Sequence, residues 1–382
     1  MNIVREDLKT RFLGESKAEL VDENGDKIIE TPTAEANLQE VRQKEEFNGI
    51  YKLGICLPNK AFNMNPFIDK RASISDEKDI EAGVLDFDKW LDKSQAFVSS
   101  FAPKYSSELK DYSAQNRYTR EVSMRSKASF LTIPETPNIT STKRLIIKAK
   151  AKLKSEGKEK KILVQIGMNQ DEEDFALMCK LGATKANGFI VEWENVRDRW
   201  YNLKAMAGYY GSKAIRILHN VPREYQRGGL LTTSATLADL VSHATITGWG
   251  RKDGKKQKKL TEVQRKKVEI IKALRFRRSD DSFGRYVDYR SDGITSMECD
   301  CEADQFAGDT IDDFIRTYNN YPYYATNVHN VCAIYQAIGD VRSHMSKGLI
   351  NYFGLMPYAR KVIEDVYHQN PWQARLKSKP SG

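Results

Sequence analysis

Cysteine, aspartate and histidine residues with the spacing of metal ligands lie near the C-terminal end of the chain. Cys299 and Cys301 are separated by one residue, Asp304 follows, and His329 comes about twenty-five residues later. Thiolates, a carboxylate and an imidazole spaced in this way can converge on a tetrahedral zinc ion, so we expect a structural zinc site. Cys332, about one helical turn after His329, competes with Asp304 as the fourth ligand. The alternative interpretation is two half-buried cysteines and an isolated histidine without metal.

Polar residues also follow several short apolar runs that we expect to be strands. Gln165 and Gly167 follow one run, Glu192 ends another, His219 ends a third and Trp249 ends a fourth. Amide, carboxylate and imidazole groups can read the edge of a nucleobase, and an indole can stack on its face. A polar cap at a strand end is the competing interpretation of Gln165.

One stretch of sequence carries the whole excess of positive charge. The chain has a net charge of +9, and residues 251–278 hold thirteen Lys and Arg residues against three acidic ones. Such a density of cations would neutralise several phosphates and give salt-dependent binding of nucleic acid. A solvated basic helix is the alternative. The cations nearest the expected strand end are Arg251, Lys252, Lys255, Lys256, Lys258 and Lys259.

The elements that must position these residues alternate between apolar runs and amphipathic stretches. This alternation indicates repeated βα units around a parallel sheet, and we predict a (β/α)8 barrel of the TIM type with its active site at the carboxyl ends of the strands. An open doubly wound sheet is the competing architecture, although the sequence has no Gly-x-Gly-x-x-Gly or Walker loop. The clearest predicted strands are 161–167, 188–193, 214–219 and 244–249, with helices at 171–181, 199–210 and 236–243.

Length and composition divide the chain further. At 382 residues with 40% hydrophobic content, it is large enough for one barrel with appended elements. Asn24-Gly25 between two short apolar runs predicts an N-terminal hairpin. The predicted divisions are an N-terminal appended element (1–48), the barrel (49–278), a small zinc-binding subdomain (279–350) and a C-terminal helix and tail (351–382).

The same composition predicts a cytoplasmic protein with no membrane partner. No apolar run approaches the roughly 18 residues of a membrane-spanning helix, and the N-terminal residues do not resemble a secretory signal. The five cysteines, few and irregularly spaced, favour reduced thiols or metal binding over a disulfide framework.

The C-terminal motif resembles the zinc subdomain of tRNA-guanine transglycosylases. It has Cys299-Asp300-Cys301, then His329-Asn330 followed by a helix-like segment at 331–342 that leads to Lys347-Gly348. The family's third cysteine is Asp304 here. Looser similarity extends over residues 130–350: Gln165 and Gly167 match a strand that ends Val-Gln-Gly-Gly in the family, and segments 188–193 and 218–222 match two further family strands.

The resemblance implies an enzyme that exchanges guanine for a 7-deazaguanine base in a nucleic acid, with DNA favoured over tRNA. It also implies a structural zinc, hydrogen bonding of the heterocycle by Gln165, and a pocket lined by the backbone near Glu192. In that family the zinc-helix region often contributes to dimers, so a homodimer is among the implied partners while the oligomeric state stays open.

The catalytic carboxylates are where the chain departs from the family pattern. The chemistry needs one carboxylate as nucleophile on the sugar C1′ and a second for proton transfer. The family's Phe-Asp at the last strand is absent, which leaves Asp86 and Asp88 at an expected strand end, with Asp253 or Glu135 in rearranged roles. Each acid has a surface location as its alternative. Two other functions therefore remain: a catalytically inactive paralogue that binds nucleic acid or partners an active subunit, and an unrelated βα-barrel enzyme.

Overall fold

The computed structural model describes part of the chain, in segments separated by gaps. Predictions about the other residues, including the zinc subdomain and the basic residues 251–259, lie outside this part. The described residues are 2–5, 18–21, 24–31, 33–37, 61–63, 77–94, 98–100, 112–167, 170–196, 199–207, 209, 213–221, 238–243, 275–277 and 283–285.

The fold is of the α/β class, with a parallel sheet whose strands are interleaved with helices. Five strands pair in parallel and in chain order, which confirms the expected sheet. They are β7 (Phe130–Ile133), β8 (Lys161–Ile166), β9 (Gly188–Glu192), β10 (Ile215–Val221) and β11 (Leu240–His243). From β11 the sheet continues in parallel through β4 (Thr33–Asn37), β5 (Ala61–Asn63) and β6 (Val98–Ser100).

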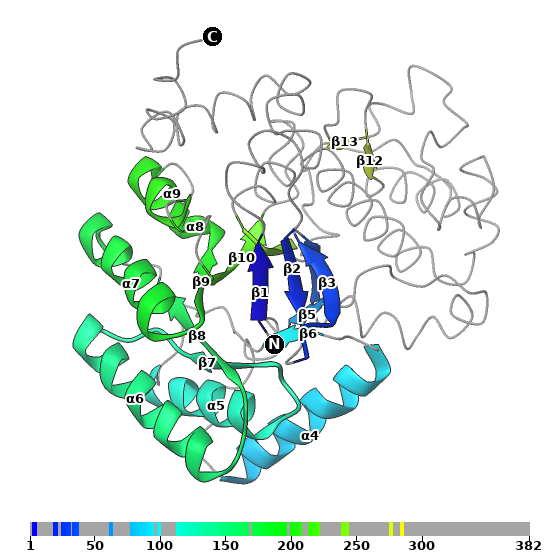
Figure 1. Ribbon diagram of the computed structural model, residues 1–382, viewed down its shortest axis with the longest axis vertical. Coiled ribbons are helices and arrows are strands. Elements are labelled where there is room, and N and C mark those ends of the chain that lie inside the picture. The colour runs from blue at the N-terminus through cyan, green and yellow to red at the C-terminus, as the bar shows by residue number, and fades with distance from the viewer. Residues whose placement is uncertain are drawn as a thin grey trace, which may run out of the picture.

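Helices lie along the outside of these strands (Figure 1). They are α4 (Glu77–Ser94), α5 (Tyr112–Arg125), α6 (Ile139–Ser155), α7 (Glu172–Lys185), α8 (Trp193–Val196) and α9 (Trp200–Ala207). In α6 the buried apolar residues Ile146, Ala149 and Leu153 recur every three to four positions, as expected for a helix with one face against a sheet. The predicted helix at 171–181 is confirmed by α7, and the one at 199–210 by α9.

Local sequence signals fix both ends of α6. Asn138 caps its first turn, because its Oδ1 accepts the Ser141 N–H at 2.9 Å. Gly157, with φ of 62°, follows the last turn, and the Lys158 N–H then reaches back to the Leu153 carbonyl at 2.9 Å. The helix therefore begins directly after the β7 loop and stops before β8.

The two faces of the sheet have different partners. We call the face against α6 and α7 the outer face, because Gly182 of α7 packs on the Cβ of Phe189 there. The opposite, inner face carries a buried apolar cluster that crosses β7 to β11: Phe130, Leu163, Ile190, Ile215, Ile217 and Leu240. The alternation of side chains along each strand, together with the printed register, assigns every residue of these strands to one face.

An N-terminal antiparallel sheet supplies one more member of the inner cluster. β1 (Asn2–Arg5) and β3 (Lys27–Thr31) flank β2 (Ala18–Val21), and Leu20 of β2 joins the inner-face cluster. The predicted hairpin is confirmed, with Gly25 at φ of 90° in its turn. β4 also falls within the first 48 residues yet pairs in the parallel sheet, so that sheet begins inside the segment expected to be an appendage.

Two further findings concern the second half of the described chain. Residues 240–243 form strand β11, so the predicted helix at 236–243 is wrong. An antiparallel pair, β12 (Arg275–Arg277) and β13 (Phe283–Arg285), crosses the expected boundary at residue 278. Within the described segments, the helices are too short or too polar to traverse a lipid bilayer.

Candidate functional site

Four polar side chains lie on the inner face toward the carboxyl ends of consecutive strands. Thr132 comes from β7, Gln165 from β8, Glu192 from β9 and His219 from β10, and each is at most 3% exposed. The register places Glu192 beside His219, with Gln165 beside Ile190 one layer below them. The inner face is therefore apolar toward its amino end and polar toward its carboxyl end, where a parallel α/β sheet binds its ligands.

Glu192 and His219 form the uppermost pair of this group. His219 Nδ1 lies 3.9 Å from Glu192 Oε1. This separation is longer than a hydrogen bond. A carboxyl group and an imidazole are both side chains that can donate a proton to a bound ligand or accept one from it.

A second carboxylate, Glu135, reaches the same edge from the loop after β7. A Cβ atom at residue 167 would overlap the Glu135 carboxyl group, so the missing side chain of Gly167 makes the space in which that group lies. Asn116 Nδ2 donates to the Glu135 carbonyl at 2.9 Å, and Asn195 Nδ2 donates to the Gly167 carbonyl at 2.5 Å. These bonds fix both loop backbones. Since Ile166 pairs with Val191, Gly167 is also the β8 neighbour of Glu192, and the two carboxylates flank it.

The structure contradicts the prediction that Asp86 and Asp88 end a strand. Both belong to α4, and Asp88 Oδ1 accepts the Lys127 backbone N–H at 2.6 Å. Lys127 precedes β7, so Asp88 lies at the amino edge of the sheet, opposite the edge that carries Gln165 and Glu192. These two aspartates are thus remote from the polar group of the inner face.

Of the predicted base-binding residues, three lie together. Gln165, Gly167 and Glu192 meet at the carboxyl edge, whereas Trp249 lies outside the described residues. So do the third candidate acid, Asp253, the proposed nucleic-acid contacts Arg251, Lys252, Lys255, Lys256, Lys258 and Lys259, and the proposed zinc ligands Cys299, Cys301, Asp304 and His329. No group of three or more potential metal ligands occurs within the described segments.

Thr132 and Asn195 are two members of the site that sequence reasoning did not single out. Thr132 could have been found from its position two residues after Phe130, because a strand with Phe130 facing inward must direct Thr132 inward as well. Asn195 had no such signal. It lies in α8, one turn beyond the end of β9, and its contact with Gly167 depends on how that short helix folds back.

The chain matches no protein-family model and no curated protein.

Proposed function

We propose that this chain is a transglycosylase-like enzyme that exchanges guanine for a 7-deazaguanine base in a nucleic acid, with DNA favoured over tRNA. The observation that carries the proposal is the buried group of Thr132, Gln165, Glu192 and His219 at the carboxyl edge. Together these side chains supply hydrogen-bond donors and acceptors within an otherwise apolar interior, as recognition of a flipped-out heterocycle requires. The resemblance to tRNA-guanine transglycosylases adds the identity of the base.

We further propose that the sheet closes into a (β/α)8 barrel. The eight strands have the order β6-β5-β4-β11-β10-β9-β8-β7, which is chain order read around a ring and interrupted only between β6 and β7. Residues of these two strands approach one another. Pairing of β6 with β7 would complete the ring, turn the inner face into the barrel interior and bring the polar group to its mouth.

The catalytic carboxylates in this proposal are Glu135 and Glu192 in place of Asp86 and Asp88. Glu135, which is half-buried beyond the end of its strand, is placed to attack C1′ of the sugar, forming a glycosyl-enzyme bond as the glycosidic bond to guanine breaks. Glu192, beside His219, gives the leaving guanine its proton and takes one from the entering 7-deazaguanine. The incoming base then displaces Glu135 and restores the glycosidic bond.

The remaining parts of the proposal concern residues outside the described segments. Cys299, Cys301, Asp304 and His329, or Cys332 in place of Asp304, would hold a structural zinc that stabilises the C-terminal subdomain. The basic residues between Arg251 and Lys259 would contact phosphates. Asp253 and Trp249 stay proposed neighbours of the sugar and base.

The test is incorporation of labelled guanine and of labelled 7-cyano-7-deazaguanine into duplex DNA and into tRNA. We expect label in DNA with the unaltered protein, a loss of about a thousandfold or more with Glu135→Gln, and of about a hundredfold with Glu192→Gln. The matched control is Glu159→Gln, because Glu159 is exposed next to the start of β8, at the opposite edge. Unchanged incorporation with both site variants would refute the assigned carboxylates.

A catalytically inactive paralogue is the second candidate, and the position of Asp86 and Asp88 on α4 favours it. No aspartate directly follows β7, β8 or β9, where the family places acids, and Asp171 beyond β8 serves as the N-cap of α7. Nucleic-acid binding without label entering either polymer would support this candidate.

A further inference from the structure

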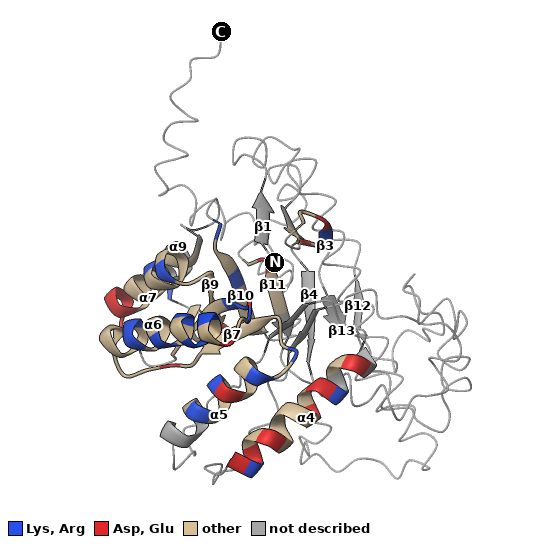
Figure 2. Ribbon diagram, turned by 60° about the horizontal axis from the view of Figure 1, so that its bottom comes forward, with Lys and Arg blue, Asp and Glu red and all other residues tan. Residues whose placement is uncertain are grey.

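Helix α6 carries a concentration of positive charge that the other described outer helices lack. Six of its seventeen residues are Lys or Arg, and none is acidic. In α4, six acidic residues outnumber three lysines, and α7 has three acidic residues against two lysines. Figure 2 shows this contrast, with blue along α6 and red along α4. The positive charge is thus concentrated on one helix, α6, whereas α4 and α7 carry a net negative charge.

Five of the six cations face solvent. They are Lys143, Arg144, Lys148, Lys150 and Lys154, all exposed. Within the described part of the chain, no ion pair joins any of these five to an acidic side chain. They form two rows on the solvent face, one through 143, 150 and 154 and one through 144 and 148, on either side of the exposed Ile147.

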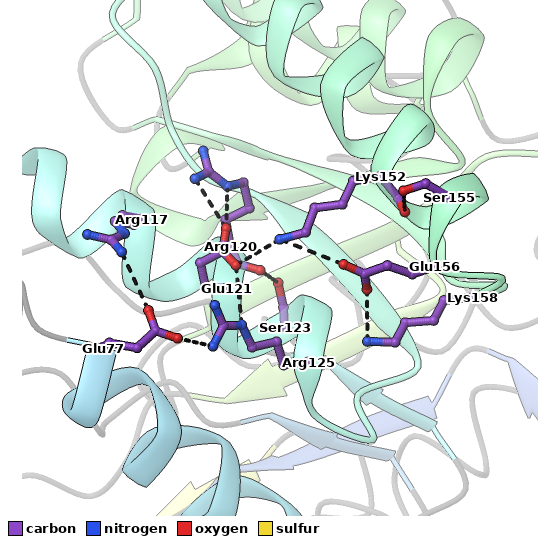
Figure 3. A network of polar contacts seen from close by, with 10 residues as sticks. All are labelled: Glu77, Arg117, Arg120, Glu121, Ser123, Arg125, Lys152, Ser155, Glu156 and Lys158. Carbon is purple, nitrogen blue, oxygen red and sulfur yellow. Dashed lines mark hydrogen bonds and ion pairs between the residues drawn. The ribbon is translucent and has the colours of Figure 1, made fainter.

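The sixth cation, Lys152, differs from the other five because it pairs with acidic side chains. Lys152 Nζ lies 3.1 Å from Glu121 Oε2 of α5 and 3.9 Å from Glu156 Oε1 (Figure 3). Glu121 also pairs with Arg120 and Arg125 within α5, so Lys152 is its contact with α6. Glu121 and Glu156 therefore neutralise Lys152, on the side of α6 that faces α5. The two solvent-exposed rows have no such partner among the described residues.

The outward rows carry an energetic cost without a partner. Arg144 with Lys148, and Lys150 with Lys154, are spaced four residues apart, where like charges destabilise a helix. A bound anion that spans both rows would replace this repulsion between like charges with attraction. Lys143 to Lys154 covers about 16 Å of helix axis, the length of roughly five base-pair steps of duplex DNA.

We propose that the exposed face of α6 is a docking surface for the sugar-phosphate backbone of a double-stranded nucleic acid. This inference rests on the proposed function for the identity of the partner. Because α6 begins in the loop after β7, which holds Glu135, the docking surface starts at the edge of the proposed site and leads away from it. Contacts of this kind fix the position of the polymer and carry no sequence preference.

The test compares two triple variants of the full chain with the same change in charge. One is Lys143→Gln, Lys150→Gln and Lys154→Gln, and the other is Lys89→Gln, Lys180→Gln and Lys185→Gln, which alters exposed lysines of α4 and α7. Binding to a duplex DNA oligonucleotide is measured at several salt concentrations. The slope of log K against log salt should become shallower by about 2.7 in the α6 variant, at about 0.9 per lost contact, and should stay unchanged in the control.

Equal slopes for the two variants would overturn the proposal. Thermal unfolding of both variants checks that the helix is intact, and Arg144→Gln with Lys148→Gln gives a second variant if the first fails to fold. Binding to phosphatidylserine vesicles is measured in parallel, with Ile147→Ser as a further variant. If the α6 triple variant and Ile147→Ser lose vesicle binding while their DNA binding is unchanged, the surface binds a membrane and the proposal is refuted.

The readouts separate this inference from the proposed enzyme activity. A shallower slope in the α6 variant, with no label incorporated by the unaltered protein, would support the docking surface and count against the transglycosylase. Incorporation that proceeds with an unchanged slope would support the enzyme and remove the docking surface.

Discussion

Lys160 lies just before β8, where its ammonium group is largely shielded from water. Its Nζ donates to the carbonyl oxygens of Ser123 at 2.8 Å and Ser126 at 2.5 Å, which ties the end of α5 to the start of β8. Burial lowers the pKa of Lys160 from 10.5 to about 8. The folded protein thus binds this proton less tightly than the unfolded chain does.

From this shift we predict a pH-dependent stability. Between pH 8 and 10.5 the unfolded chain keeps the Lys160 proton while the folded protein releases it, so the free energy of unfolding contributed by Lys160 should rise with pH. After allowance for partial solvent exposure we expect a gain of about 2 kcal/mol. Urea unfolding across this range, for the unaltered protein and Lys160→Met, measures it as the difference between the two curves.

The exposed Lys154→Gln is the control, and its curve should parallel that of the unaltered protein. A constant difference between the unaltered protein and Lys160→Met would show that the pKa of Lys160 is not lowered.

Glu121 shows the opposite balance at a neighbouring position. Burial raises the pKa of its carboxyl group. The hydrogen bond from Lys152 and the charges of Lys152, Arg120 and Arg125 together outweigh this effect, so the pKa of Glu121 falls below its ordinary value. Its contribution to stability is therefore present above the unfolded pKa near 4.5 and is lost as the pH falls through the folded value.

Single residues also explain which site predictions the sequence could make. Gln165 and Glu192 could be placed at one edge because continuous apolar runs mark β8 and β9, and carboxyl ends of parallel strands meet. Asp86 and Asp88 were misplaced because Val84 to Asp88 alternates as a strand does. The helical spacing of the buried Ile80, Phe87 and Leu91 is the signal that decides for α4, and Leu85, 70% exposed, obscures it.

Among the elements, β11 is a second whose type was predicted wrongly, after α4, and its contacts explain why. Leu240 and Val241 are buried on opposite faces of the sheet, yet four residues are too few to separate a strand from a helical turn by periodicity. The carboxylate of Asp239, just before β11, accepts two hydrogen bonds from the buried Arg216 of β10. The backbone N–H of Arg216 donates one at 2.8 Å and its guanidinium group donates the other at 3.3 Å. That ion pair holds Asp239 beside β10 at the start of β11, and it has no local sequence signal.

Helix α7 depends on close packing against β9, and this predicts an unusual response to a glycine replacement. A Cβ atom at Gly182 would lie 2.8 Å from the Gly188 carbonyl oxygen and 2.9 Å from the Phe189 Cβ. These atoms belong to the backbone or are fixed to it, so they cannot rotate away. Gly182→Ala should therefore destabilise the protein by about 1–3 kcal/mol, although alanine ordinarily stabilises a helix by about 1 kcal/mol.

Thermal unfolding of Gly182→Ala measures this effect. A raised melting temperature would mean that α7 stands farther from β9 than the structure has it.

At the scale of the whole molecule, two features distinguish one region of the surface. The outer helices differ in charge, and the polar residues of the inner face lie toward one end of the strands. Acidic α4 and basic α6 are separate helices on the outside of the sheet (Figure 2). The polar group of the inner face lies toward the carboxyl ends of the strands. A polyanion that approaches along α6 would meet Glu135 at the start of that helix. The alternation of apolar and amphipathic segments predicted the α/β architecture. It did not predict that the most basic of the described helices, α6, would follow the loop that holds Glu135.

The N-terminal sheet should contribute to the stability of the whole described fold through one side chain. Leu20 of β2 is fully buried among inner-face residues of β7 to β11, including Phe130, Leu163 and Ile215. Leu20→Ala would leave a cavity where the two sheets meet, so we expect a loss of about 3 kcal/mol in the free energy of unfolding. Leu85→Ala makes the same chemical change on the exposed side of α4 and should cost less than about 0.5 kcal/mol. Urea unfolding of both variants measures the difference, and equal midpoints would mean that the N-terminal sheet is a dispensable appendage rather than the floor of the inner face.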